Sequence, residues 1–204
     1  RELNSETAAT LPAQGMLFFF YDAEQSVWGF DPKDKDGWRV LYAPSAAANH
    51  LDYPTDLPEQ GRYKELILTP VADQSLPEPD EAGKELGLKE AEIDNASDIF
   101  SEHQEGGGPL HQVLGYPAEV QDSMELECQL ASNGVYCGSP KGYQDPRVES
   151  LKAGAGRWRL LLQVDSDDAA GMMWGDVGRL YFWITEEDLK ARQFDKAWMI
   201  LQCY

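Results

Sequence analysis

The stretch at positions 160–189, LLLQVDSDDAAGMMWGDVGRLYFWITEEDL, decides the fold. Residues 158–164 (WRLLLQV) and 180–184 (LYFWI) are short runs of aliphatic and aromatic side chains, and the segment between them is rich in Asp and Gly. Short apolar runs bounded by turn residues are typical of buried β-strands. The stretch therefore predicts two strands joined by an acidic loop.

The end of the chain predicts a short helix and a closing strand. Thr185 followed three residues later by Asp188 resembles a capping box, and we expect the helix to run to about Phe194. Residues 198–204 (WMILQCY) are so apolar that we expect them inside the sheet, because an exposed strand of this composition would promote aggregation.

Four further strands and one helix are expected upstream. Residues 16–21 (MLFFFY), 27–31 (VWGFD) and 38–43 (WRVLYA) are rich in strand formers and are separated by turn residues, which predicts an antiparallel meander. Residues 64–70 (KELILTP) predict a fourth strand, and residues 123–132 predict a helix. The fold class that follows is mainly β (α+β), with antiparallel strands and a few short helices.

Composition limits the class of protein. The chain has 204 residues, and 42% of them are hydrophobic, which is enough for one domain (1–204) with a real core. No segment approaches the ~18 apolar residues of a membrane-spanning helix. The net charge is −19, so we expect no nucleic-acid binding, which needs basic stripes.

The cysteines and the first residue bear on compartment and boundaries. Cys128, Cys137 and Cys203 lack the spacing of a disulfide framework or a zinc site, and reduced thiols in the cytoplasm fit them best. The chain starts at Arg1 without a secretion signal, and we expect it to be N-terminally truncated.

One block of the chain holds most of the negative charge. Residues 44–105 contain fifteen acidic and four basic residues, for a local charge of −11. Within this block we expect an acidic amphipathic helix that ends before Gly106, on a peripheral insertion at 71–108. Two interpretations stay open, a solvated face and a surface that attracts a basic partner.

The loop after the first of the two long strands is a candidate metal site. Asp165, Asp167, Asp168 and Asp176 lie within twelve residues, and such a cluster favours calcium or magnesium unless the charges are neutralised otherwise. The alternative is that these carboxylates accept hydrogen bonds from backbone amides in tight turns, with Arg179 as an ion-pair partner. In that case no cofactor is needed.

Four more residues are candidate site residues. His111 is the one candidate for a general base, although a hydrogen-bonded structural histidine is the alternative. Trp174 with Met173 forms either a partner-binding patch at the surface or part of the core, and Trp174 with Tyr116 offers walls for a small-molecule pocket.

Several motifs together resemble the YwqG family of bacterial proteins. They are LPAQGMLFFFYD at 11–22, HQVLGYPAEVQ at 111–121, MELECQL at 124–130 and, above all, residues 160–189, so the resemblance runs from Leu11 to Tyr204. It implies a roll-like, mainly β fold in one compact unit. It supplies no catalytic residues, and it links the chain to proteins encoded near polymorphic toxin systems.

These observations predict a cytoplasmic, non-enzymatic module that binds a basic protein through an acidic face, in the manner of an immunity protein. The alternative is a divalent-cation-dependent binding protein or hydrolase that uses the loop between Asp165 and Asp176. The sequence leaves the oligomeric state open.

Overall fold

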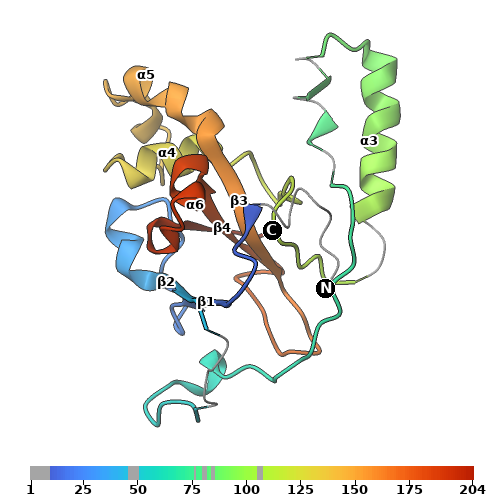
Figure 1. Cartoon of the computed structure of the whole chain (residues 1–204). Coiled ribbons are helices and arrows are strands. Elements are labelled where there is room, and N and C mark those ends of the chain that lie inside the picture. Colours follow the sequence, from blue (N-terminus) through green and yellow to red (C-terminus); the bar gives the residue numbers. More distant parts are fainter. Residues whose placement is uncertain (1–9, 46–50, 76, 80–81, 84–85, 105–107) are drawn as a thin grey trace.

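The computed structural model describes residues 10–45, 51–75, 77–79, 82–83, 86–104 and 108–204. Figure 1 shows two antiparallel sheets with short helices around them, so the chain is a mixed α+β protein. β1 (Met16–Tyr21) pairs with β2 (Trp38–Ala43), and β3 (Trp158–Asp165), β4 (Arg179–Thr185) and β5 (Trp198–Gln202) form the second sheet in the order β3-β4-β5. The predictions of these five strands are confirmed, with shifts of one or two residues at their ends.

The connection between β1 and β2 contains a 3-10 helix, η1 (Pro32–Gly37). Asp31 caps this helix by accepting a hydrogen bond from the amide of Lys33 (2.9 Å), and Pro32 suits the first helical position because its missing N–H would have no partner there. The register places Phe19 opposite Val40. The predicted PKDKDG turn is thus a capped helical turn.

The two sheets pack on each other through aromatic rings. The ring of Phe19 on β1 meets that of Phe182 on β4 at a centroid distance of 5.1 Å, and Trp38 on β2 meets Trp198 on β5 at 4.9 Å. Trp38 also donates its indole N–H to the carbonyl of Ala197 (2.9 Å). Edge-to-face aromatic pairs add roughly 0.5–1.5 kcal/mol each to the burial of these large rings. One part of the core therefore lies between the sheets, and another part lies under α4.

The opposite face of the three-stranded sheet is covered by helices. α4 (Glu125–Ser132) is joined to it through buried Gln129, whose side-chain oxygen accepts the indole N–H of Trp158 at 2.9 Å. The short helices η3 (Gly142–Gln144), α5 (Val148–Leu151) and η4 (Lys152–Arg157) follow α4 and lead into β3. The helix predicted at residues 123–132 is confirmed.

Two predicted strands are wrong. Residues 27–31 are not a strand, because Gly29 has a φ of +91° and the amides of Trp28 and Gly29 both donate to the carboxylate of Asp34. Residues 64–70 are irregular chain, since only Lys64 finds a main-chain partner, the carbonyl of Ala170 (2.9 Å).

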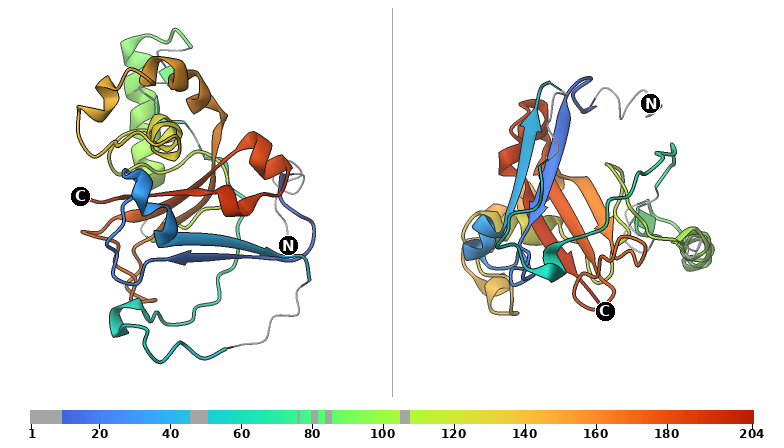
Figure 2. Two further views of the ribbon diagram at one scale, coloured as in Figure 1. Left: turned by 90° about the vertical axis from the view of Figure 1, so that its left-hand side faces the viewer. Right: turned by 90° about the horizontal axis from the view of Figure 1, so that it is seen from below.

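The remaining helices are short, apart from one. η2 (Glu59–Gly61) is a single turn, and the helix expected from Thr185 to Phe194 is instead split into α6 (Glu186–Lys190) and η5 (Phe194–Lys196). The predicted acidic helix is α3 (Glu90–Gln104), which stands apart from the two sheets (Figures 1 and 2). No helix in the described part of the chain is long and apolar enough to cross a membrane.

Candidate functional site

Polar side chains gather on the face of the three-stranded sheet that points away from β1 and β2. The antiparallel register pairs Gln163 with Tyr181, Asp165 with Arg179, and Arg179 with Gln202, and residues paired across a ladder project to the same face. Residues 110–122, which we call the crossing segment, run over this face from β3 to β5. The crossing segment contains the HQVLGYPAEVQ motif.

Two buried glutamines fasten the crossing segment to the sheet. Gln163 accepts the amide of Ala118 (2.9 Å) and donates to the carbonyl of Leu110 (2.6 Å). Gln202 accepts the amides of Val120 and Gln121, both at 3.1 Å, and donates to the carbonyl of Asp122 (2.7 Å). An irregular segment over a buried sheet has backbone groups that need partners, and the two carboxamides supply them.

Arg179 and Tyr181 complete this attachment on β4. The carbonyl of Ala118 accepts hydrogen bonds from the Arg179 guanidinium (2.8 Å) and from the Tyr181 hydroxyl (2.7 Å). Burial raises the pKa of the Tyr181 hydroxyl well above its usual range, so it remains a hydrogen-bond donor at neutral pH.

Asp165 has partners for both carboxylate oxygens. One oxygen accepts the amide of Leu110 (2.8 Å), and the other accepts the amide of Ser166 (2.9 Å). Nε of Arg179 lies 3.0 Å from the second oxygen, an ion pair in which the N–H is not aligned for a hydrogen bond. Asp165 as a whole residue is 7% exposed. The protein therefore supplies hydrogen bonds and a cation to its buried carboxylate, which needs no further partner.

His111 bridges the crossing segment and the loop at residues 165–178, which we call the aspartate loop. Its Nδ1 accepts the backbone amide of Asp165 at 3.2 Å, so the ring proton is on Nε2, which faces Oδ2 of Asp167 at 3.3 Å. Both ring nitrogens are therefore engaged. A general base needs an unoccupied lone pair aimed at a substrate, and the structure supports the structural role of this histidine instead.

Asp167 organises the tip of the aspartate loop. Its Oδ1 accepts the amide of Ala169 (2.8 Å), and its own amide and carbonyl form a narrow bridge with Met172. Burial disfavours the charged form, but hydrogen bonds from His111 and from the amides of Ala169 and Ala170 outweigh it and hold the pKa of Asp167 below its usual range. This is the turn chemistry that the sequence offered as the alternative to a metal.

The four predicted metal ligands do not meet at one point. Asp168 and Asp176 are exposed, whereas Asp165 and Asp167 are buried. Asp165 accepts a backbone amide and pairs with Arg179, and Asp167 accepts a backbone amide and faces His111. Over the residues that the structure describes, no three His, Cys, Asp or Glu side chains are grouped so that they could hold a metal ion. The prediction of a calcium or magnesium site thus has no geometric support in this loop.

Of the two alternatives for Trp174, a surface patch or part of the core, the structure shows the core. Trp174 is 4% exposed, donates its indole N–H to the carbonyl of Asp165 (3.1 Å) and meets the rings of Tyr21 and Tyr63 edge to face. The aromatic ring is large enough to fill the space between the loop and β1, and burial there outweighs any role as an exposed platform. Trp174 is part of the core that holds the loop.

Met173 and Tyr116 are exposed, at 44% and 52%, as binding residues should be. The structure records no ring contact between Tyr116 and Trp174 among the described residues. A shallow hollow lies elsewhere, over residues 20–22 and 36–39 of β1, η1 and β2, and neither Trp174 nor Tyr116 lines it. The predicted small-molecule pocket with these two walls remains only a prediction.

The residues that hold the aspartate loop and the crossing segment were not predicted from the sequence. Besides Gln163 and Gln202, Gln25 donates to the carbonyl of Met173 (2.8 Å) and accepts the amide of Gly175 (3.2 Å). Gln25 has a left-handed φ of +52°. The one available signal was the presence of Gln163 in an otherwise apolar strand, since a polar side chain at a buried position needs a partner.

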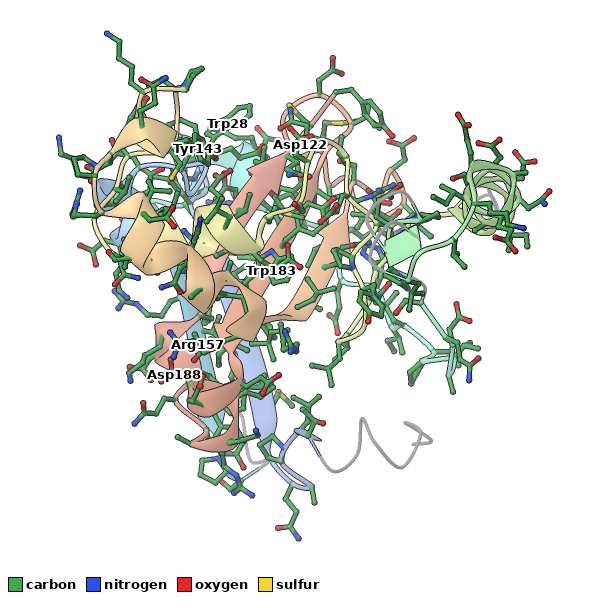
Figure 3. The ribbon with its side chains drawn as sticks, turned by 90° about the horizontal axis from the view of Figure 1, so that it is seen from above. Trp28, Asp122, Tyr143, Arg157, Trp183 and Asp188 are labelled. Carbon is green, nitrogen blue, oxygen red and sulfur yellow. The ribbon has the colours of Figure 1, made fainter. Side chains whose placement is uncertain are left out.

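Another group that was not predicted from the sequence lies among the helices that follow the crossing segment. Burial raises the pKa of Glu127 on α4 to about 7, although a hydrogen bond with Tyr143 partly opposes this. Tyr143 lies among the helices α4 and α5 in Figure 3. Burial also raises the pKa of Cys137 to about 12, so this thiol is unreactive.

Comparison with protein families gives one assignment. The family model "Domain of unknown function (DUF1963)" matches residues 1–203. The chain belongs to this family. A comparison with curated proteins gave no match. The DUF1963 match spans the crossing segment, the aspartate loop and α3 alike, so the same family sequence includes both the polar network and the acidic block.

The polar network of this DUF1963 protein uses its hydrogen-bonding atoms on the protein itself, and this limits what it can do chemically. Asp165, Asp167, His111, Gln163 and Gln202 each use their polar atoms on neighbouring protein groups. Such a network rigidifies a surface, because each hydrogen bond fixes two segments that are far apart in the chain. It therefore holds the crossing segment and the aspartate loop in place on the sheet.

Proposed function

We propose that this DUF1963 protein is a non-enzymatic module that binds a basic protein through the acidic side that carries α3. The observation that carries the proposal is the placement of α3, which projects from the two sheets with most of its drawn side chains directed into open space (Figure 3). The motifs that resemble the YwqG family support the same proposal, because that resemblance links the chain to proteins encoded near polymorphic toxin systems.

The charges of α3 are accessible. Glu90, Glu92, Asp94 and Asp98 are all exposed, and Ile93 anchors the helix by packing against Gly83. Glu92 reaches back to the amide of Lys89 (2.8 Å), which fixes the first turn. A row of carboxylates on a helix away from the body creates a negative potential that raises the association rate of a cationic partner, and salt screens this effect.

A rigid body suits this function. Binding costs less when the surface does not need to become ordered on association. The glutamine and aspartate network holds the start of the crossing segment next to β3, and α3 precedes that start in the chain. The proposal thus assigns a supporting role to the polar network and the recognition role to the acidic side.

The test uses a short Lys- and Arg-rich peptide as the basic probe. Its association rate is measured by stopped flow at low and high salt, with the intact chain and with the variant Glu90→Gln, Glu92→Gln, Asp94→Asn, Asp98→Asn. Glu92→Gln keeps the acceptor that the amide of Lys89 needs. The expected result is fast, salt-sensitive association with the intact chain, slowed by about tenfold or more in the variant.

The matched control removes the same charge elsewhere. Glu24, Asp36, Glu149 and Asp195 are exposed carboxylates on the body of the protein, and all four are changed to the corresponding amides. If this control slows association as much as the α3 variant does, net charge and not the acidic side attracts the peptide. Association that is indifferent to salt would also overturn the proposal.

A further inference from the structure

Residues 65–72 form an unpaired stretch of chain, which we call the open segment. Lys64, directly before it, donates its amide to the carbonyl of Ala170 (2.9 Å). Beyond this point the described structure gives no hydrogen bond to any backbone N–H or carbonyl of residues 65–72, and none of these residues is in a helix, a strand or a turn. The open segment thus offers its main chain to solvent.

The side chains of the open segment are apolar and exposed. Leu66 is 37% exposed, Ile67 94%, Leu68 62% and Val71 83%. Large aliphatic residues of this kind favour strands, and the sequence pattern itself predicts a strand here. Scattered exposed apolar residues are ordinary, but four within six positions on an unpaired backbone are typical of a strand without its neighbour.

The surroundings of the open segment define what would pair with it. Figures 1 and 2 show that it leads from the body of the protein to the side that carries α3. Glu65 lies at its start, and the exposed carboxylates of α3 lie on the same side. A second copy of this chain carries the same net charge of −19, so charge repulsion disfavours self-pairing and charge attraction favours a cationic strand.

We propose that residues 65–69 pair with an extended basic strand of the partner protein, by addition of that strand to the open segment. This proposal rests on the proposed function, since it names the part of the basic partner that is recognised. Main-chain hydrogen bonds supply the affinity of such strand addition, and alternating side chains supply specificity. Leu66 and Leu68 point to one side of an extended strand and Ile67 to the other, so the matching strand alternates aliphatic residues with Lys or Arg. Pro70 lacks an N–H and ends the pairing.

The experiment uses a peptide of alternating Lys and Val and a matched peptide that is N-methylated at every residue. The two peptides carry the same charge and the same side chains, but the second has no main-chain N–H to donate from either edge. We expect the methylated peptide to bind at least about tenfold more weakly, because several main-chain hydrogen bonds are lost. Amide hydrogen exchange at residues 66–69 slows only with the first peptide.

Variants of the chain provide a second readout. Ile67→Pro removes an N–H that has no partner in the free protein, and Ile67→Thr keeps that N–H while shortening the side chain. Since Ile67 is 94% exposed, both variants should keep the fold. The proposal predicts that Ile67→Pro weakens binding of the unmethylated peptide more than Ile67→Thr does.

The outcomes separate this inference from the proposed function. If both peptides bind equally and with salt dependence, recognition by the acidic side stands and strand addition is overturned. If neither peptide binds at low salt, both proposals are overturned. If sedimentation shows a dimer and residues 66–69 are already protected without peptide, a second copy occupies the open segment and the basic strand is overturned as its occupant.

Discussion

Replacing Glu127 by Gln should stabilise the protein above neutral pH. Glu127 is on α4, half-buried, hydrogen-bonded to Tyr143 and close to Cys137. Burial raises the pKa of Cys137 to about 12 and that of Tyr143 well above its usual range, so both neighbours are uncharged at neutral pH. The described ion pairs include no cation for this carboxylate.

The sign and size of the effect follow from the pKa of Glu127. Burial raises it from 4.5 to about 7 in the folded protein, so the folded state holds a proton that the unfolded state releases between these pH values. The free energy of unfolding therefore falls as pH rises from 4.5 to about 7 and then levels off. At about 1.4 kcal/mol per pH unit, the loss is about 3 kcal/mol. Glu127→Gln has no proton to lose and escapes this loss.

The assay is urea unfolding of both proteins from about pH 5 to about pH 9, with Glu149→Gln as the control, because Glu149 is an exposed glutamate on the neighbouring helix α5. The difference in the free energy of unfolding between Glu127→Gln and the intact chain should grow with pH and reach about 3 kcal/mol. The Glu149→Gln difference should stay small. A Glu127→Gln difference that does not change with pH would refute the reasoning.

Three further predictions concern the polar network. Gln163→Leu leaves the amide of Ala118 and the carbonyl of Leu110 without their side-chain partner. It should lower the free energy of unfolding, measured by urea unfolding, by about 2–4 kcal/mol. A loss below about 1 kcal/mol would mean that the carboxamide does not hold the crossing segment. The pKa of Asp167 is lowered in the folded protein, so its contribution to stability is present above about pH 4 and is lost as pH falls through the folded pKa. Asp167→Asn should therefore make the free energy of unfolding fall less steeply with acid. An unchanged fall of this free energy below about pH 4 would contradict the prediction. Millimolar calcium, magnesium or manganese should leave Tm unchanged, because Asp165 and Asp167 are already engaged; a Tm that rises with any of these ions would show that the loop binds it.

The sequence predicts the strands that bury their side chains on both faces or between the sheets. β3, β4 and β5 are apolar runs whose composition alone indicates burial. Residues 27–31 fail because local chemistry overrides composition, with a left-handed Gly29 and an Asp34 carboxylate that takes two amides. Residues 64–70 fail for another reason. A strand needs a neighbour, and composition does not reveal whether a neighbour is present.

The site was harder to predict than the fold because its interactions join distant parts of the chain. The charge of the aspartates marked them as candidate metal ligands, and hydrogen bonds to backbone amides in tight turns were the predicted alternative. The glutamines carry no charge and no reactive group, and Gln202 contacts amides about eighty positions away, so nothing local marks it. The position of Trp174 stayed open between surface and core, because its neighbours Met173 and Gly175 lie in the loop, whereas its burial depends on the distant rings of Tyr21 and Tyr63.

The central claim is that recognition takes place on the acidic side and the open segment, while the aspartate loop supports the fold. Amide chemical shifts measured while the alternating Lys and Val peptide is added test this most directly. The account predicts that the amides of residues 65–69 and of the first two turns of α3 shift and that those of residues 165–178 stay in place. Shifts confined to the aspartate loop, with α3 and the open segment unchanged, would contradict it.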